Sequence, residues 1–157
     1  MILLDQFLEK SALVGNENRI MNVAFFKNEF TIKDFEYTHF PSLDLFFDTQ
    51  TKEDGLRNAL VEAEFAIAET GSVVIDSYNE NLRLATCLAE KLVVVVPLSK
   101  LVAGMHDVAE FLEERTSNEG AYVAFITGAS RTADIERVLT IGVHGPKEMT
   151  VIIINDL

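Results

Sequence analysis

The chain has a single cysteine, Cys87, among its 157 residues. One thiol cannot form an internal disulfide bond, and it cannot supply the four thiolates that usually hold an iron–sulfur cluster. Because Cys87 lies in an apolar, helix-like stretch, we expect a buried structural thiol. The sequence therefore excludes both a disulfide scaffold and a cluster bound by this chain alone through four cysteines.

Long apolar runs and a signal peptide are also absent. The longest strongly apolar run, Leu92 to Leu98, is far shorter than the roughly 20 residues of a membrane-spanning helix. The N-terminal residues have neither the basic region nor the long apolar core of a signal peptide. We therefore expect a cytoplasmic protein that has no membrane partner.

Basic residues are scarce, because 13 Lys and Arg stand against 25 Asp and Glu and give a formal net charge of −12. A nucleic-acid backbone or an anionic membrane surface attracts clustered Lys and Arg, so neither is an expected partner. The acidity is typical of a soluble protein. No linker-like, repetitive or low-complexity tract divides the chain, which predicts a single domain over residues 1–157.

Familiar cofactor motifs are missing. The sequence contains no Walker A, GxGxxG or GxSxG element, and no two of its three histidines have zinc-ligand spacing. It gives no positive indication of ATP, a dinucleotide, a serine nucleophile or a metal. We therefore expect no cofactor.

Strand-like and helix-like segments alternate along most of the chain, which specifies an α/β layered domain. Unbroken valines over 92–96 predict a strand that is buried on both faces. Residues 1–43 are expected to form a short helical or irregular N-terminal segment before an α/β core over 44–157. Expected strands cover 43–48, 65–68, 72–76, 92–96, 122–127 and 150–155, and expected helices cover 2–12, 52–63, 81–91, 104–115 and 133–139.

The densest polar chemistry lies between the expected strand 122–127 and the expected helix 133–139. Backbone N–H groups at such a junction are free to bind an anion, and Arg131 adds a cation. In an open α/β sheet, ligands bind beyond the carboxyl ends of strands, where this loop is expected to lie. The alternative is structural: Asp134 complements a helix dipole and Glu136 is an exposed helix residue. The candidate anion-binding residues are Thr127, Gly128, Ser130, Arg131, Thr132, Asp134 and Glu136.

A second candidate segment joins two expected strands at Ala68 to Ser72. Glu69 follows an apolar run, so partial burial could raise its pKa and suit a general base or a nucleophile. Thr70, Gly71 and Ser72 are candidate binding residues. The alternative is a tight hairpin, in which Gly71 supplies a positive φ and the Ser72 side chain hydrogen-bonds nearby backbone groups.

A third candidate segment surrounds His144, between Gly142 and Pro146. Glycine on both sides allows a close backbone approach, so His144 could orient a substrate or transfer protons, and Gly145 could line the site. The equal alternative is that His144 has a structural role alone, as a hydrogen-bond partner of a neighbouring loop. We expect Glu69, Arg131 and His144 to surround one pocket.

Together these segments resemble the LUD-domain family. The sequences AETGS at 68–72, TGASRTADIE at 127–136 and GVHGPKE at 142–148 occur in the family's order, within a similarity from about Leu45 to Asp156. Ala129 stands where many members have proline, and the segment before Asp44 is shorter than in a typical member. The resemblance implies a three-layer αβα fold similar to the sugar-phosphate isomerase and CoA-transferase superfamily.

The resemblance also implies a role in oxidising L-lactate to pyruvate with iron–sulfur partner subunits. Three functions remain open. The chain is an accessory or ligand-binding subunit that binds a small anionic metabolite, a carboxylate or a phosphate; or it is an enzyme of the isomerase or CoA-transferase type that uses Glu69. The third alternative is a non-catalytic interaction module.

Overall fold

A five-stranded parallel sheet forms one half of the molecule in the computed structural model, which describes residues 2–43, 57–133, 139–141 and 145–157. Every strand of this sheet is hydrogen-bonded in parallel to its neighbours. In spatial order the strands are β1 (Glu17–Met21), β11 (Glu148–Ile154), β6 (Lys91–Pro97), β3 (Asn58–Glu62) and β2 (Tyr37–His39). The expected α/β class is therefore confirmed. The expectation that residues 1–43 are only helical or irregular and precede the core is wrong, because β1 and β2 from this segment form the two edges of the parallel sheet.

A second, four-stranded sheet is mixed. Strand β5 pairs antiparallel with both β4 and β8, whereas β4 and β7 are parallel. In spatial order the strands are β7 (Leu101–Val102), β4 (Phe65–Ile67), β5 (Ser72–Asp76) and β8 (Val123–Ile126). The expected hairpin between β4 and β5 is confirmed, since Gly71 has φ +70° and its N–H donates to Ile67 O at 2.9 Å.

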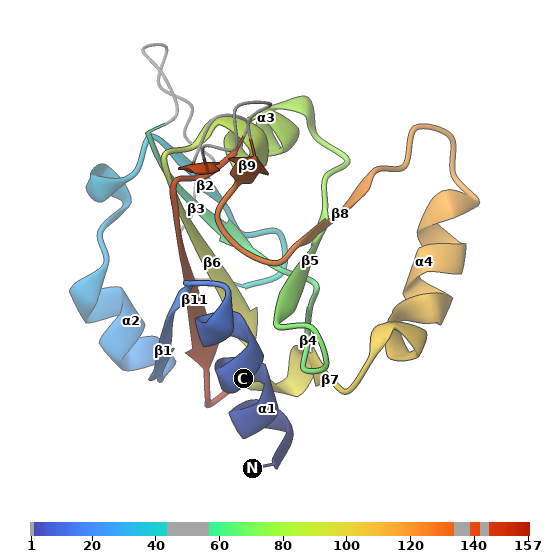
Figure 1. Cartoon of the computed structure of the whole chain (residues 1–157), viewed down its shortest axis with the longest axis horizontal. Coiled ribbons are helices and arrows are strands. Elements are labelled where there is room, and N and C mark those ends of the chain that lie inside the picture. The colour runs from blue at the N-terminus through green and yellow to red at the C-terminus, as the bar shows by residue number, and fades with distance from the viewer. Residues whose placement is uncertain (1, 44–56, 134–138, 142–144) are drawn as a thin grey trace.

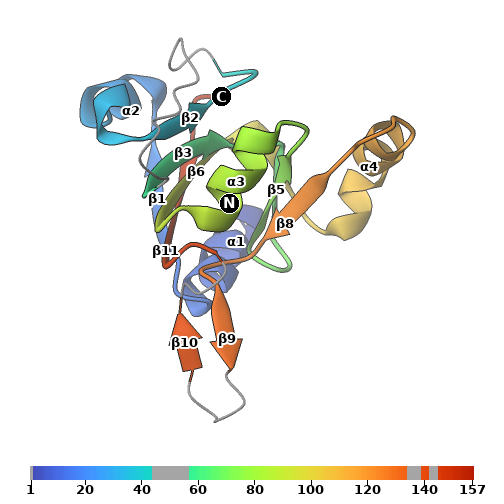
Figure 2. The same cartoon turned by 90° about the horizontal axis from the view of Figure 1, so that it is seen from above.

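Helices cover both sheets and separate them (Figures 1 and 2). The main core joins α1 and α3 to facing residues of both sheets. A second core packs α2 and Phe35, which follows η1, on the other face of the parallel sheet. A third core packs η3 and α4 on the outer face of the mixed sheet. The helical elements are α1 (Ile2–Leu13), α2 (Val23–Glu29), η1 (Ile32–Asp34), α3 (Glu80–Leu88), η2 (Leu98–Lys100), η3 (Met105–Val108) and α4 (Ala109–Thr116).

Strand β6 shows why the sheet lies at the centre. Leu92, Val94 and Val96 contribute to the main core, while Val95 contributes to the core under α2. Burial on both faces, as expected from the unbroken valines, is thereby confirmed. Each fully buried valine contributes about 1.5 kcal/mol or more from removal of apolar surface from water.

Two helix predictions were wrong. Residues 58–62, expected in a helix over 52–63, form β3 because their apolar run is buried between β2 and β6. The expected helix over 133–139 does not begin at Ala133, because β9 (Arg131–Ala133) pairs antiparallel with β10 (Leu139–Ile141). Long-range pairing overrides local propensity in both cases. The strand expected over 43–48 falls largely outside the described residues.

The surface also corrects one prediction. Cys87 is exposed, because it lies on the outer side of α3, whereas Leu82 and Ala85 face the core. Among the described residues, no helix combines the length and the apolar character that crossing a membrane requires.

Candidate functional site

The hairpin segment and the long polar loop meet at Ser72 and Thr127. Their hydroxyl oxygens lie 2.8 Å apart. The contact follows from the register of β5 and β8, in which Val73 pairs with Ile126, so the residues just outside that pair lie side by side. Two segments that the sequence singled out separately therefore form one surface.

The loop after β8 also contacts the third motif. Ser130 N–H donates to Pro146 O at 2.8 Å. A Cβ added at Gly145 would lie 2.9 Å from the Ser130 Cβ, so a side chain at that position would force the two loops apart. The glycine is thus explained by close approach.

Arg131 is an exposed cation at the start of β9. Its Nη2 donates to Val14 O at 2.6 Å, across the turn between α1 and β1. Gly15, with φ +90°, allows this contact, because a Cβ there would lie 2.9 Å from Nη2. Within the described ranges, Arg131 has no carboxylate partner in an ion pair. With respect to these described residues, its remaining N–H groups are available to an anion.

Asn16 is a site residue that sequence reasoning missed. It is 7% exposed, and its Nδ2 donates to Thr127 O at 2.7 Å and to Ser11 Oγ at 3.0 Å. Its Oδ1 is buried and has no hydrogen-bond partner in the part of the chain that the structure describes. A Cβ at Gly128 would lie 3.0 Å from that oxygen. In the sequence, Gly15-Asn16 indicates only a turn.

These contacts border an open cavity of about 370 Å³. Among the described residues that line it, Arg131 is the only charged one, and the others are mainly apolar. The cavity lies beyond the carboxyl end of β8, in the mixed sheet rather than the parallel one, and Asn16 places it beside the amino end of β1. Because Arg131 begins a strand, the expected helix N-terminus does not start at this loop. The lining residues are Val14, Phe125, Ile126, Thr127, Gly128, Ala129 and Arg131.

Glu69 lies at the opposite edge of the mixed sheet. Its backbone N–H donates to Ala103 O, and its Oε1 accepts from Met105 N, each at 3.0 Å. The exposed carboxylate therefore caps the first turn of η3, on the β7 side, whereas Thr127 follows β8. Glu69 does not line the Arg131 cavity.

The other candidate residues divide into two groups. Thr70 is exposed in the hairpin turn, Gly71 is buried against the backbone of α1, and Thr132 pairs with Thr140 in the β9–β10 ribbon. Asp134, Glu136 and His144 lie outside the described residues, so the expected meeting of His144 with Arg131 stays a prediction.

A polar cluster at the carboxyl end of the parallel sheet was not expected from the sequence. His39, at the end of β2, is 7% exposed, and its Nε2 lies 3.4 Å from Tyr78 Oη. Burial lowers the pKa of His39, although the charges of Glu62 and Asp76 act in the opposite direction. Glu62 is fixed by two backbone N–H donors, from Ser42 and Leu43, each at 3.0 Å.

Near this cluster, burial raises the pKa of Glu64, and the charge of Glu62 acts in the same direction. Among the described residues, no group of three or more His, Cys, Asp or Glu side chains is arranged to hold a metal ion.

Fold and cavity together define an α/β domain with a pocket whose described lining includes the cation Arg131. Residues 55–154 match the LUD domain, and the chain belongs to the LUD domain family. The resemblance drawn from the three motifs is therefore confirmed.

Several similar proteins are named lactate utilization protein C. Lactate utilization protein C of Geobacillus thermodenitrificans is 39% identical over 98 residues, which cover 60% of this chain and 40% of that protein. Lactate utilization protein C 1 of Bacillus mycoides is 30% identical, over 98% of this chain and 67% of that protein. The matches to several such relatives thus span less than half of their length. A crystal structure of a DUF162 family protein from Deinococcus radiodurans shares the fold, with a TM-score of 0.68 and 16% identity over 98% of this chain and 96% of that one.

Proposed function

We propose that this chain is an accessory, ligand-binding domain of L-lactate utilization and that it binds a small carboxylate in the Arg131 cavity. The names of its relatives support the metabolic context. The observation that carries the binding role is the guanidinium of Arg131, which is held on Val14 O without an ion-pair partner in the described ranges.

The cavity suits a short carboxylate better than a highly charged phosphate. A guanidinium can donate two parallel hydrogen bonds to a carboxylate. One cation balances one negative charge, and the apolar wall from Val14, Phe125 and Ile126 can cover a methyl group. The exposed Thr127 adds a hydroxyl that can contact the 2-hydroxyl or keto oxygen of a lactate-sized ligand.

Titration with L-lactate, pyruvate and sugar phosphates, followed by calorimetry and thermal unfolding, tests this role. We expect a carboxylate at a hundred times its dissociation constant to stabilise the fold by about 2.7 kcal/mol. Arg131→Gln should abolish the shift, whereas Lys147→Gln, which removes an exposed cation paired with Glu90, should leave it unchanged. No shift with any of these anions in folded protein would contradict the proposal.

We also propose that electron transfer resides in iron–sulfur partner subunits, as the family resemblance implies, and that the chain binds no redox cofactor. The purified protein should then be colourless and should not reduce an artificial dye with L-lactate until such subunits are added. Unaided turnover of L-lactate would overturn the accessory role and favour an enzyme.

The alternative enzyme of the isomerase or CoA-transferase type depends on Glu69. The Glu69 carboxylate accepts a hydrogen bond from Met105 N and so caps η3. No described contact directs this carboxylate toward the Arg131 cavity. Labelling of Glu69 by a carboxylate-directed reagent, blocked by substrate, would restore that alternative. The relationship of the fold to that superfamily stays a proposal.

A further inference from the structure

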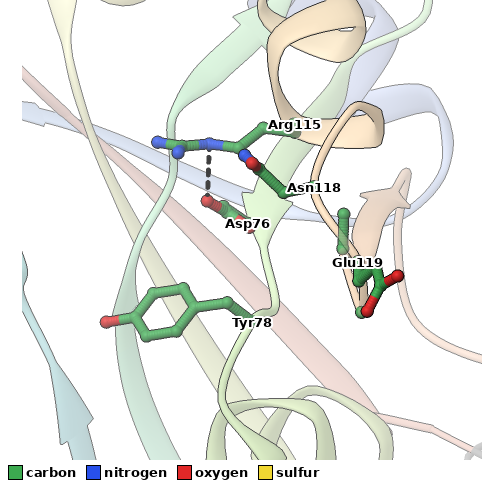
Figure 3. A pocket seen from close by; sticks show the side chains of 7 residues that line it. Asp76, Tyr78, Arg115, Asn118 and Glu119 are labelled. Atoms are coloured by element: carbon green, nitrogen blue, oxygen red, sulfur yellow. Dashed lines mark ion pairs between the residues drawn. The ribbon is translucent and has the colours of Figure 1, made fainter.

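A second cavity, of about 420 Å³, opens between the end of β5, the last turn of α4 and the loop that leads into β8 (Figure 3). It shares no lining residue with the Arg131 cavity. Unlike that cavity, it presents charges of both signs. Its lining residues are Asp76, Tyr78, Arg115, Asn118, Glu119, Gly120 and Ala121.

Arg115 supplies a fixed cation to this cavity. Its Nε lies 2.9 Å from Asp76 Oδ2, and its guanidinium lies 5.4 Å from the centre of the Phe111 ring. Figure 3 shows that Nε faces Asp76 and that the two Nη atoms lie at the tip of the Arg115 side chain, past this contact. No described residue accepts a hydrogen bond from these Nη atoms. They form a pre-oriented fork of the kind that binds a carboxylate.

The opposite charge comes from Asp76 and Glu119. The Asp76 side chain is only 9% exposed and uses one oxygen for Arg115, whereas Glu119 is exposed and has no ion-pair partner within the described residues. The carboxyl end of α4 adds the partial negative charge of its carbonyl groups. Two carboxylates against one guanidinium disfavour a ligand that carries only negative charge.

We propose that this cavity binds a free α-amino acid in its zwitterionic form. The ligand carboxylate pairs with the Nη atoms of Arg115, and the ligand ammonium pairs with the carboxylate of Asp76. The exposed Glu119 side chain, whose carboxylate points away from Asp76 in Figure 3, turns toward the ammonium when the ligand binds. The half-exposed ring of Tyr78 and the methyl group of Ala121 contact the ligand side chain. Such a ligand satisfies both signs of charge without breaking the Asp76–Arg115 pair. The proposal is independent of lactate binding at Arg131.

The first experiment is calorimetry with the full chain and each of the twenty amino acids, followed by analogues of the best ligand. The Arg131→Gln background removes carboxylate binding at the other cavity. We expect the amino acid to bind about tenfold or more tightly than its amide, which lacks the carboxylate, and than the matching 2-hydroxy acid, which lacks the ammonium. Alanine, alaninamide and lactate form one such set.

Glu119→Gln is the main variant, because Glu119 is exposed and its loss should leave the fold intact. It should weaken binding about tenfold or more, whereas Glu113→Gln, an exposed residue of α4 outside the cavity, should not. Arg115→Lys should weaken binding of the amino acid more than binding of its amide. Absence of binding by all twenty amino acids, equal binding of the hydroxy acid, or equal affinities of the Glu119 and Glu113 variants would each overturn the proposal.

Discussion

Ser72 and Thr127 join two loops that are 55 residues apart in the chain, with their hydroxyl oxygens at 2.8 Å. Ser72 is 5% exposed, so the contact is anchored on its buried side by the β4–β5 hairpin. The hairpin that carries Glu69 thus positions the loop that carries Arg131, although Glu69 and Arg131 lie at different edges of the mixed sheet.

A double-mutant cycle should measure this contact. Ser72→Ala and Thr127→Val each remove one hydroxyl. Either substitution alone breaks the hydrogen bond between them, so the coupling free energy should be about 1 kcal/mol, the value of one neutral hydrogen bond. Urea unfolding of the four proteins gives the values. Ser72→Ala combined with Thr116→Val, at the end of α4, is the control and should be additive; additivity in the first cycle would refute the coupling.

Gly71 and Gly120 should respond differently to alanine. Both have positive φ, +70° and +80°. A Cβ at Gly71 would lie 2.5 Å from Ser11 N, whereas one at Gly120 would meet no atom within 4 Å. We expect Gly120→Ala to cost about 1–2 kcal/mol from backbone strain alone, and Gly71→Ala to cost roughly 3 kcal/mol or more, since α1 must also move. Chemical denaturation compares the two, and equal losses would contradict the close packing of α1 on the hairpin.

Tyr37→Phe should be neutral or stabilising at pH 7. The Tyr37 hydroxyl is buried and has no hydrogen-bond partner among the described residues, so its removal sacrifices no bond there. Burial raises the pKa of Tyr37 to about 12, and the charge of Tyr78 adds to the effect. Since the folded state keeps this proton more tightly, stability from Tyr37 falls as pH rises from about 10 to 12.

The variant should therefore lose less stability than the native chain between about pH 10 and 12. Tyr122→Phe, at an exposed tyrosine, is the matched control. A Tyr37 variant that is clearly less stable at pH 7 would show that the hydroxyl has a partner.

His39 should make stability depend on mildly acidic pH. Burial lowers the pKa of His39, although the carboxylates of Glu62 and Asp76 act in the opposite direction. The unfolded chain then binds more protons than the folded one between the lowered pKa and about 6.5. Stability should fall as pH drops below about 6.5, down to the pKa of the folded state.

Replacement of His39 by glutamine should flatten this part of the stability profile, measured by urea unfolding at closely spaced pH values. His106→Gln serves as the control, because His106 is largely exposed. An unchanged slope in the His39 variant would mean that another group titrates.

Elements with a strong local pattern were predictable. The helix α1 agrees within one residue with the helix expected over 2–12, and Phe7 lies on its buried face with Leu4 and Leu8 packed beside it. The β4–β5 hairpin follows from Thr70-Gly71, and β6 from its valines. The segment 58–62 was predicted to be helical, because a short apolar run has no period that separates a buried strand from a buried helix.

The candidate site was predictable only in its chemistry. The motifs identified Ser72, Thr127, Ser130 and Arg131, which the fold gathers near one cavity. The sequence offered no sign of Asn16 or of the Val14 carbonyl, which lies 117 residues from Arg131. The sequence also could not show that Glu69 lies away from that cavity. The order of the strands in the mixed sheet sets the distance between Glu69 and the cavity.

Periodicity and composition were sufficient for the α/β class, the buried central strand and the polar loops, since these features depend on neighbours within a few residues. Chain-distant packing set the rest: the strand state of residues 58–62, the β9–β10 ribbon, and the Asp76–Arg115 pair between β5 and α4. These outcomes depend on which surfaces bury one another and on which polar groups then find partners. That information arises when the chain packs, and no local pattern of residues contains it.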